Sequence, residues 1–414
     1  MGLGARPRTE RHSSRTGSKA EAFRPLPFAL PHYVASRGSG STGSQEGTLT
    51  VAPDPPIQNR RITKIRPLSS PKELRHQLPM TSQQERAVVR DREAVASILH
   101  GTDDRLLVVV GPCSLHDPAA GLEYARRLAH LAEDLKGELC IVMRAYFEKP
   151  RTTVGWKGLI NDPDLDGTYR VNEGLLTARA FLLEVISLGL PVGCEFLDPI
   201  TAQFLADTVS WGAIGARTTR SQIHRQLASG LSMPVGFKNS PDGDVQAAVD
   251  AVAAATHAQV FPGIDDEGRA AIFETSGNPD GHVVLRGSST GPNFDERAVA
   301  DALTRIDNAG LAAGLVVDAS HANSGKDFRK QPLVAADVAL RLGSGEKGIV
   351  GLMLESFLSQ GRQELPDNRS TPLVFGQSIT DECIGWETTV STLCLMAQAV
   401  SRRRDLASPS FSFR

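Results

Sequence analysis

Eight short apolar runs in this 414-residue chain are each followed closely by a residue that could take part in chemistry. The runs are Leu106–Val110, Leu139–Met143, Pro191–Cys194, Ala213–Ala216, Pro234–Phe237, His282–Leu285, Leu315–Val317 and Ile349–Leu354. The residues that follow them are Cys113, Arg144, Glu195, Arg217, Lys238, Arg286, His321 and Glu355. Thiols, imidazoles and carboxylates are potential metal ligands, whereas arginines and lysines bind phosphate groups.

The potential metal ligands form a mixed soft and hard set. Cys113 lies in Gly111-Pro-Cys-Ser114, His321 in Ser320-His-Ala-Asn323, Glu355 closes the last run, and Asp381 lies in Ser378-Ile-Thr-Asp381. Such a set suits a divalent Mn, Fe, Co or Zn ion. A single Cys or His after a strand is more often structural. The prediction of a metal site therefore depends on all four residues lying close together in the folded chain.

The cations form a second set. They are Arg144, Arg217, Lys238 and Arg286, each after a different run, with Lys149 and Arg151 after the second run. Burying so many positive charges together is unfavourable without anions, so two phosphate groups are expected. The alternative is that one or two of these cations form salt bridges with Glu195, Asp198 or Asp318.

Helical segments fill the spaces between the runs. They are Glu85–His100, Ala119–Lys136, Asn172–Leu188, Ile200–Ser210, Ser221–Leu231, Val245–Ala255, Glu296–Ala309, Leu333–Leu342 and, at the end, about Asp381–Arg404. Strands that alternate with helices predict a parallel sheet, and eight such units predict a closed (β/α)8 TIM barrel. In that α/β fold the strand ends meet at one mouth, where active sites lie.

Other segments fall outside this repeat. Residues 259–275 read as an inserted β-hairpin, a place suited to regulation or assembly. Residues 57–404 would form the barrel, and residues 405–414 a frayed tail. Residues 1–56 have the composition of a disordered tail, and their Arg and Ser content also fits a transit peptide or an upstream-start artefact. His224 and His257 are expected at the surface.

The composition is that of a soluble enzyme, with 40% hydrophobic and 22% charged residues. A net charge of −2 gives no reason to expect nucleic acid binding. No apolar run reaches the roughly 18–20 residues needed to cross a bilayer, so no membrane partner is expected. Five scattered cysteines follow no disulfide pattern, which indicates a reducing, cytoplasmic location.

Several long motifs resemble type I 3-deoxy-D-arabino-heptulosonate 7-phosphate (DAHP) synthases. They are Gly111-Pro-Cys-Ser114, the segment 143–158, Gly212-Ala-Ile-Gly-Ala-Arg-Thr-Thr219, Pro234-Val-Gly-Phe-Lys-Asn239, Ser320-His-Ala-Asn323 and Ser378-Ile-Thr-Asp381. The resemblance runs from about Arg60 to Arg402. It implies a TIM barrel that condenses phosphoenolpyruvate with D-erythrose 4-phosphate, the first step of the shikimate pathway to chorismate and the aromatic amino acids.

The resemblance also implies roles for individual residues. Cys113, His321, Glu355 and Asp381 would bind the divalent metal, and Lys149, Cys113 and His321 would be catalytic. The phosphoenolpyruvate site would contain Arg144, Lys149, Glu195, Arg217, Lys238 and Arg286. Erythrose 4-phosphate would bind at Lys149, Pro150, Arg151 and Thr152.

Feedback inhibition by Phe, Tyr or Trp is common in the family, and members are often dimers or tetramers. The effector site would include Leu227, Leu231, Ser232, Phe261 and Gly263, and the small residue Gly263 favours Tyr by leaving room for a larger effector. The chain departs from the family pattern in four places: Ala202 replaces a common Pro, Arg220 stands where an acid is usual, Ser288-Ser-Thr-Gly291 replaces a Gly-Lys-containing loop, and Asn293-Phe294 stands where Asn-Tyr is commoner.

Two other functions remain open from the sequence. One is a different phosphoenolpyruvate-aldose phosphate synthase, such as the eight-carbon enzyme of lipopolysaccharide synthesis, although Lys149-Pro-Arg-Thr152 favours the four-carbon sugar. The other is a catalytically inactive regulatory barrel, which the complete set of metal ligands disfavours.

Overall fold

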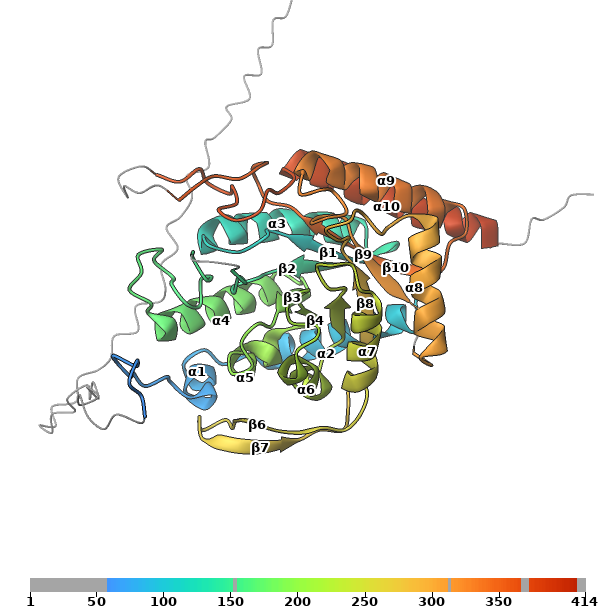
Figure 1. Cartoon of the computed structure of the whole chain (residues 1–414). Coiled ribbons are helices and arrows are strands. Elements are labelled where there is room, and N and C mark those ends of the chain that lie inside the picture. Colours follow the sequence, from blue (N-terminus) through green and yellow to red (C-terminus); the bar gives the residue numbers. More distant parts are fainter. Residues whose placement is uncertain (1–57, 152–154, 312–313, 366–371, 408–414) are drawn as a thin grey trace, which may run out of the picture. The chain divides into compact units, whose positions relative to one another are not determined.

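The computed structural model describes residues 58–151, 155–311, 314–365 and 372–407. Eight parallel strands form a closed barrel in the order β1-β10-β9-β8-β5-β4-β3-β2 (Figure 1). The strands are β1 (Leu106–Gly111), β2 (Leu139–Arg144), β3 (Val192–Glu195), β4 (Trp211–Ile214), β5 (Val235–Lys238), β8 (Gly281–Leu285), β9 (Leu315–Asp318) and β10 (Ile349–Glu355). The predicted TIM barrel is therefore confirmed.

The barrel closes between its first and last strands. β1 pairs with β10 on one side and with β2 on the other, and Gly111 lies opposite Glu355 at the C-terminal end. A Cβ atom on Gly111 would lie 2.4 Å from the carbonyl oxygen of Arg144, so only glycine lets β1 and β2 approach here. The register thus brings the loop that holds Cys113 beside the ends of β2 and β10.

Helices surround the barrel. They are α1 (Pro71–Gln77), α2 (Ser82–Leu99), α3 (Pro118–Asp134), α4 (Val171–Ser187), α5 (Ala202–Leu205), α6 (Gln222–Gly230), α7 (Gln246–Ala255), α8 (Glu296–Asn308), α9 (Gln331–Gly343) and α10 (Trp386–Ala407), with 3-10 turns η1 (Ala206–Thr208) and η2 (Phe328–Lys330). None of these helices, within the described part of the chain, is both long and apolar enough to cross a membrane.

Most predicted helices agree with the structure to within a few residues, but two predictions need correction and one helix was missed. The segment Ile200–Ser210 is not one helix but α5 followed by η1. The last helix begins at Trp386, not at Asp381, and continues to Ala407, beyond the predicted limit at Arg404. The short helix α1 was not predicted. The predicted tail 1–56 and residues 408–414 lie outside the described residues.

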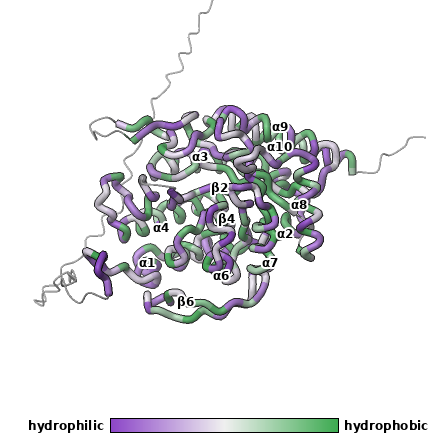
Figure 2. Tube along the Cα trace, in the orientation of Figure 1, coloured by the Kyte–Doolittle hydropathy of each residue, from purple (hydrophilic) through white to green (hydrophobic). Residues whose placement is uncertain are grey.

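The buried side chains form two clusters, one between the barrel and its helices and one inside the barrel. Along the surrounding helices hydrophobic and hydrophilic residues alternate (Figure 2), as expected when one face packs on the strands. Val95, Ile98 and Leu99 of α2 belong to the inner cluster together with Leu107 and Trp211. α2 therefore closes one end of the barrel interior. The polar residues at the C-terminal ends of the strands lie at the other end.

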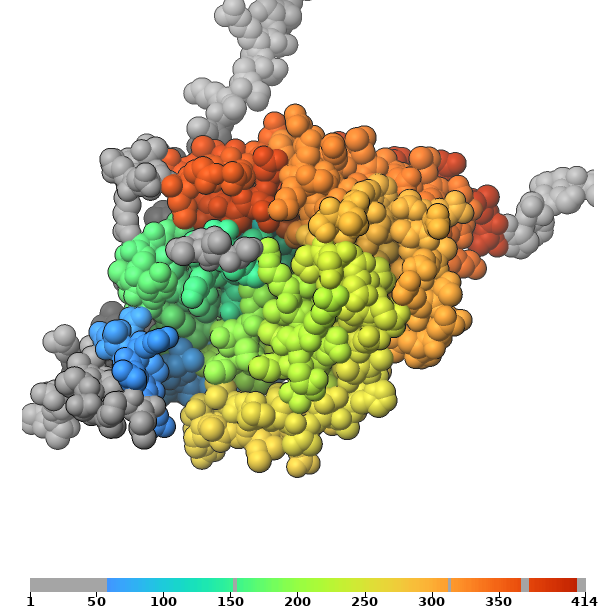
Figure 3. All heavy atoms as spheres, in the orientation of Figure 1, coloured from blue at the N-terminus to red at the C-terminus, as the bar shows by residue number. Residues whose placement is uncertain are grey.

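The inserted hairpin is present as predicted, with β6 (Val260–Ile264) antiparallel to β7 (Ala270–Glu274). Its atoms lie along the lower edge of the view in Figure 3. The tip contacts α1, where Lys72 pairs with Glu267 at 2.5 Å and Arg75 with Asp266 at 2.6 Å. The hairpin is therefore fixed to the barrel at its tip as well as at its base.

Candidate active site

A cavity of about 290 Å³ opens at the C-terminal ends of the barrel strands. Its lining contains most of the residues predicted to bind substrates: Arg144, Lys149, Pro150, Arg151, Glu195, Arg217, Lys238 and Arg286, together with His321 and Asp381. Residues that lie up to 237 positions apart in sequence thus surround one space, as the barrel predicts. Thr152 lies outside the described residues.

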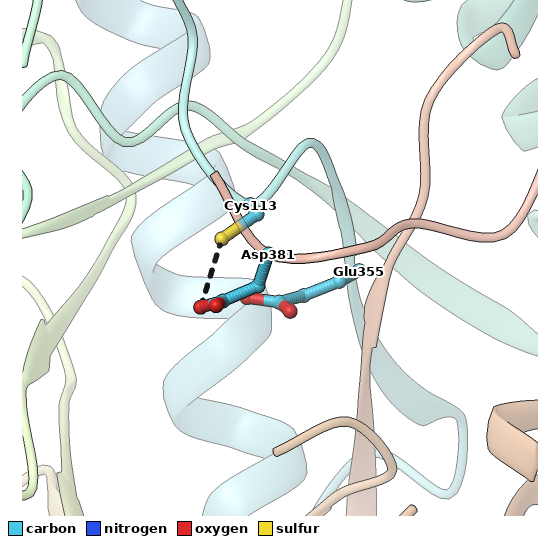
Figure 4. A group of neighbouring side chains, drawn as sticks. All are labelled: Cys113, Glu355 and Asp381. Atoms are coloured by element: carbon cyan, nitrogen blue, oxygen red, sulfur yellow. Dashed lines mark hydrogen bonds between the residues drawn. The ribbon is translucent and has the colours of Figure 1, made fainter. Parts of the chain in front are cut away.

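Cys113, Glu355 and Asp381 form a candidate metal site beside this cavity. Their ligand atoms all lie within 4.8 Å of one another. The close-up in Figure 4 shows the three side chains converging from two loops and the end of β10, with the Cys113 thiol donating to Oδ2 of Asp381 at 3.5 Å. Three of the four predicted ligands are therefore brought together, from elements that are distant in sequence.

His321, the fourth predicted ligand, stands at the edge of this cluster. Its Nε2 atom lies 3.8 Å from Oε1 of Glu355, and its Nδ1 atom lies 2.9 Å from Oδ2 of Asp318. A carboxylate at Nδ1 favours the tautomer that leaves Nε2 available as a ligand or acceptor. The backbone of His321 has φ of 53°, in the left-handed region that non-glycine residues seldom adopt. Such conformations concentrate at functional sites.

Arg144 is held rigidly at the end of β2. Its guanidinium donates to Oε1 of Glu355 at 2.8 Å and to the carbonyl oxygens of Pro112 and Cys113. It also lies 3.8 Å from the centre of the Tyr146 ring, a cation–π contact. Both Arg144 and Glu355 are almost fully buried. Arg144 therefore fixes the orientation of one metal-site carboxylate while it lines the cavity.

Lys149 reaches the metal-site donors directly. Its ammonium lies 2.7 Å from Sγ of Cys113 and 3.3 Å from Oδ2 of Asp381. Burial raises the pKa of the Cys113 thiol to about 12, so the sulfur keeps its proton and accepts from Lys149. Burial works against the charge of Asp381, but Lys149 and His321 outweigh it and hold its pKa below the usual range. Two of the donors, Cys113 and Asp381, thus already contact one cation.

Two further cations of the cavity, Lys238 and Arg286, differ in their partners. Lys238 pairs with the buried Asp318 at 3.2 Å, which is one of the salt bridges considered from the sequence. In contrast, the Nε atom of Arg286 has no hydrogen-bond partner among the described residues. Burial lowers the pKa of Arg286, and the nearby charge of Arg217 acts in the same direction. An anion bound between Arg286 and Arg217 would relieve both effects.

The remaining lining residues are positioned by local geometry. Glu195 ends β3, and a Cβ on Gly215 would lie 2.6 Å from its Oε1 atom, so this glycine makes room for the carboxylate. Arg151 donates through Nε to the carbonyl oxygen of Trp156 at 2.9 Å, which leaves its other guanidinium nitrogens for a ligand. Both predicted residues therefore present polar groups to the cavity.

Some residues of the site, or their full roles, were not predicted from the sequence. Lys326 lines the cavity although it lies eight residues beyond the end of β9. Asp318 contacts both His321 and Lys238, and this double contact is evident only from the folded structure. Gln331 fixes the backbone of Glu355 through both its amide atoms. The Ser-His-Ala-Asn motif marks the loop that carries Lys326, but no periodicity identifies the lysine itself.

A closed parallel barrel with a thiol–carboxylate cluster beside a strongly cationic cavity defines a (β/α)8-barrel enzyme with an anion-binding active site and a candidate metal centre. Comparison with known proteins defines the class more narrowly. Residues 77–393 match the DAHP synthetase I family.

Individual relatives agree with this match. The Phe-sensitive phospho-2-dehydro-3-deoxyheptonate aldolase of Escherichia coli K12 is 53% identical over 83% of this chain and 97% of its own length. The Tyr-sensitive enzyme of the same strain is 49% identical over 81% of this chain and 94% of its own length. A solved structure of the enzyme from Francisella tularensis SCHU S4 has a TM-score of 0.81 at 47% identity, and covers 83% of this chain and 99% of that one.

The chain therefore belongs to the DAHP synthetase I family. It is a DAHP synthase, a transferase of the shikimate pathway, from a family whose members are sensitive to aromatic amino acids. The identities of 53% and 49% to a Phe-sensitive and a Tyr-sensitive relative are too similar to determine the effector of this chain.

Proposed function

We propose that the cavity at the strand ends condenses phosphoenolpyruvate with D-erythrose 4-phosphate and water, giving DAHP and phosphate. The observation that supports this assignment is the meeting of a thiol–carboxylate cluster with a wall of cations in one cavity. Both substrates carry phosphate groups, which match arginine and lysine side chains.

The two substrates would occupy different parts of the cavity. Phosphoenolpyruvate would lie against Arg144, Lys149, Glu195, Arg217, Lys238 and Arg286, where the Nε atom of Arg286 has no hydrogen-bond partner among the described residues. Erythrose 4-phosphate would lie along Lys149, Pro150, Arg151 and Thr152. Holding both dianions in one orientation removes much of the entropic barrier to their reaction.

Cys113, Glu355 and Asp381, with His321 at their edge, would hold a divalent Mn, Fe, Co or Zn ion. The donors fit such an ion because they combine a sulfur and carboxylate oxygens within 4.8 Å of one another, with the His321 imidazole 3.8 Å from Glu355. Two of them, Cys113 and Asp381, already contact the ammonium of Lys149. When bound, the ion supplies Lewis-acid polarisation of the aldehyde oxygen.

One of the chain's own groups supplies the proton for carbon–carbon bond formation. C3 of phosphoenolpyruvate attacks the aldehyde carbon of erythrose 4-phosphate, and Lys149 donates the proton that the new alkoxide takes up. Water then adds at the cationic C2 and loses a proton, and cleavage of the bond between C2 and the phosphate oxygen releases phosphate and leaves the C2 ketone. Lys149 is the best placed acid because its ammonium reaches both the metal-site donors and the cavity.

Regulation would take place at a second pocket, of about 490 Å³, beneath the hairpin. Leu227, Leu231, Ser232 and Phe261 line it, as expected for the proposed effector site of an aromatic amino acid. Gly263 is different: a Cβ there would lie 2.4 Å from the Phe273 ring, which already fills the space beside the glycine. This packing does not by itself decide between Tyr and Phe, so the preference for Tyr stays a prediction.

The location and assembly of the enzyme are also proposals. Five cysteines remain as free thiols, which is consistent with a reducing, cytoplasmic environment. A homo-oligomer, dimer or tetramer, is supported by the outward face of the hairpin, where Val260 and Ile272 are 62% and 75% exposed. Light scattering of the purified enzyme would measure the subunit count.

The substrate assignment is tested by supplying phosphoenolpyruvate with either erythrose 4-phosphate or arabinose 5-phosphate. We expect product only, or at least a hundredfold faster, with the four-carbon sugar. Preference for the five-carbon sugar would contradict the assignment. Adding Phe, Tyr or Trp to the same assay identifies the effector.

A further inference from the structure

The loop after β9 carries a cation that none of the roles above includes. Lys326 lines the active-site cavity in common with Arg286 and His321, and its side chain is exposed at the rim. The family resemblance placed no substrate contact on this residue. The inference below rests on the proposed function, because it concerns how phosphoenolpyruvate is held in the same cavity.

This loop is built directly onto the end of β8. The backbone N–H of Ala322 donates to the carbonyl oxygen of Arg286 at 3.2 Å. Asn323 donates through its side chain to the carbonyl oxygens of Leu285 at 3.1 Å and Asp318 at 2.8 Å. The segment that presents Lys326 is therefore fixed next to Arg286, on the phosphoenolpyruvate side of the cavity.

The backbone at Lys326 is held in an uncommon conformation. Its φ is 63°, in the left-handed region, and its N–H donates to the carbonyl oxygen of His321 at 2.6 Å. A non-glycine residue in this region costs on the order of 1 kcal/mol, and such costs concentrate at functional sites. Glycine or asparagine would fit the backbone at lower cost, so the turn itself does not require a lysine side chain.

Two carboxylates, one in the same cavity and one next in sequence, already have other partners. Asp381, which shares the cavity, accepts from Lys149, and Asp327 pairs with Arg329 at 2.8 Å. Among the described residues Lys326 forms no ion pair. The loop Ser288–Gly291 on the other side of Arg286 contains no cation. Lys326 is therefore placed to be the rim cation beside Arg286.

We propose that Lys326 binds the phosphoryl group of phosphoenolpyruvate together with Arg286. The ammonium approaches from the rim, so it meets this group as substrate enters and again as inorganic phosphate leaves. Because phosphate is a product of the reaction, one side chain acts on both substrate binding and product release. Lys326 is a substrate-binding residue in this account, not a proton donor.

The test compares three variants of the full-length, Mn-loaded enzyme. Lys326→Asn removes the charge and tolerates the left-handed backbone, Lys326→Arg keeps the charge, and Lys330→Asn is a matched control on the same segment outside the cavity. Calorimetry measures the Kd of phosphoenolpyruvate alone and of inorganic phosphate alone. Steady-state kinetics then gives the KM of erythrose 4-phosphate.

Lys326→Asn should raise the Kd of both phosphoenolpyruvate and inorganic phosphate on the order of tenfold, as expected for the loss of a charge-assisted hydrogen bond. Lys326→Arg should stay within about threefold of the wild type, and Lys330→Asn and the KM of erythrose 4-phosphate should be unchanged. Unchanged affinities in Lys326→Asn, or a rise confined to the KM of erythrose 4-phosphate, would overturn the inference.

A folding defect can be separated from a binding effect. If Lys326→Asn unfolds at a lower temperature than the wild type, Lys326→Gly replaces it, since glycine adopts the same φ without strain. Normal phosphate affinity in Lys326→Gly would likewise overturn the inference. A wild-type enzyme that fails to bind phosphoenolpyruvate at all would contradict the proposed function instead.

Discussion

Oδ2 of the buried Asp318 lies 2.9 Å from Nδ1 of His321 and 3.2 Å from Nζ of Lys238. Burial works against its charge, yet His321, Lys238 and Ser320 outweigh the burial and hold the pKa of Asp318 well below the ordinary value. One carboxylate therefore orients both a candidate metal ligand and a candidate phosphoenolpyruvate ligand. The two halves of the site are linked through it.

Asp318→Asn should weaken both halves at once. Asparagine keeps the shape but loses the charge that fixes the imidazole, and loss of such an outer partner typically costs 10- to 100-fold in metal affinity or activity. We expect metal affinity to fall in that range and the Kd of phosphoenolpyruvate to rise. Asp327→Asn, which removes a partly buried carboxylate that pairs with Arg329 on the same segment, should change neither. Loss of only one of the two affinities would disprove the link.

Cys113→Ser should remove bound metal and activity together, because serine is a poor ligand for a thiophilic ion. Elemental analysis of the purified variant and turnover are measured side by side, and activity should fall at least a hundredfold. Cys394→Ser, on α10 and away from the site, is the control. A metal-free Cys113→Ser enzyme with full activity would refute the metal assignment.

Lys149→Ala should abolish turnover while phosphoenolpyruvate still binds measurably, since Arg144, Arg217, Lys238 and Arg286 remain. General acid catalysis contributes on the order of 10²- to 10⁴-fold to rates, so we expect kcat to fall by a factor of at least about 10². Lys157→Ala changes an exposed lysine of the same loop and should have normal kcat. If kcat in Lys149→Ala falls less than tenfold, the lysine only positions substrate.

Glu148 should make stability depend on pH. Burial raises its pKa from 4.5 to about 7, against the opposing hydrogen bond from Thr201. A carboxyl whose pKa is higher in the folded than in the unfolded chain binds more protons when folded, so its contribution to stability is lost as pH rises from about 4.5 to 7. The loss is at most about 3 kcal/mol.

Glu148→Gln removes this ionisation. The variant should be more stable than the wild type at pH 8, by about 1–3 kcal/mol, and should show no such gain at pH 5. Urea unfolding at the two pH values measures the difference. An equal difference at both pH values would show that Glu148 does not titrate in this range.

The barrel could be predicted because each strand is a buried apolar run of the expected length. The eight predicted runs agree with the observed strands to within about two residues at each end. The site could also be predicted from the strand ends. Cys113, Arg144, Glu195 and Lys238 each follow or end a strand, so closure of the barrel alone brings them close together. The helix α1 was missed although Ser70 and Glu73 form its capping box, a signal present in the sequence.

Contacts that depend on packing could not be predicted. His224, expected at the surface, is buried, with its ring nitrogens bonded to Ser221 and to the carbonyl oxygen of Leu197. The position of the Phe273 ring beside Gly263 depends on the hairpin register, which pairs Gly263 with Ala271 and Phe261 with Phe273. Lys326 enters the cavity from a loop with no periodicity, so only the folded loop reveals its position.

The central claim is that a metal-dependent condensation takes place at the strand ends. The most direct measurement is DAHP formation from phosphoenolpyruvate and erythrose 4-phosphate by the purified enzyme, before and after EDTA and after Mn or Co is added back. The account predicts turnover that EDTA abolishes and that either ion restores. Turnover that is unaffected by complete removal of metal would contradict it.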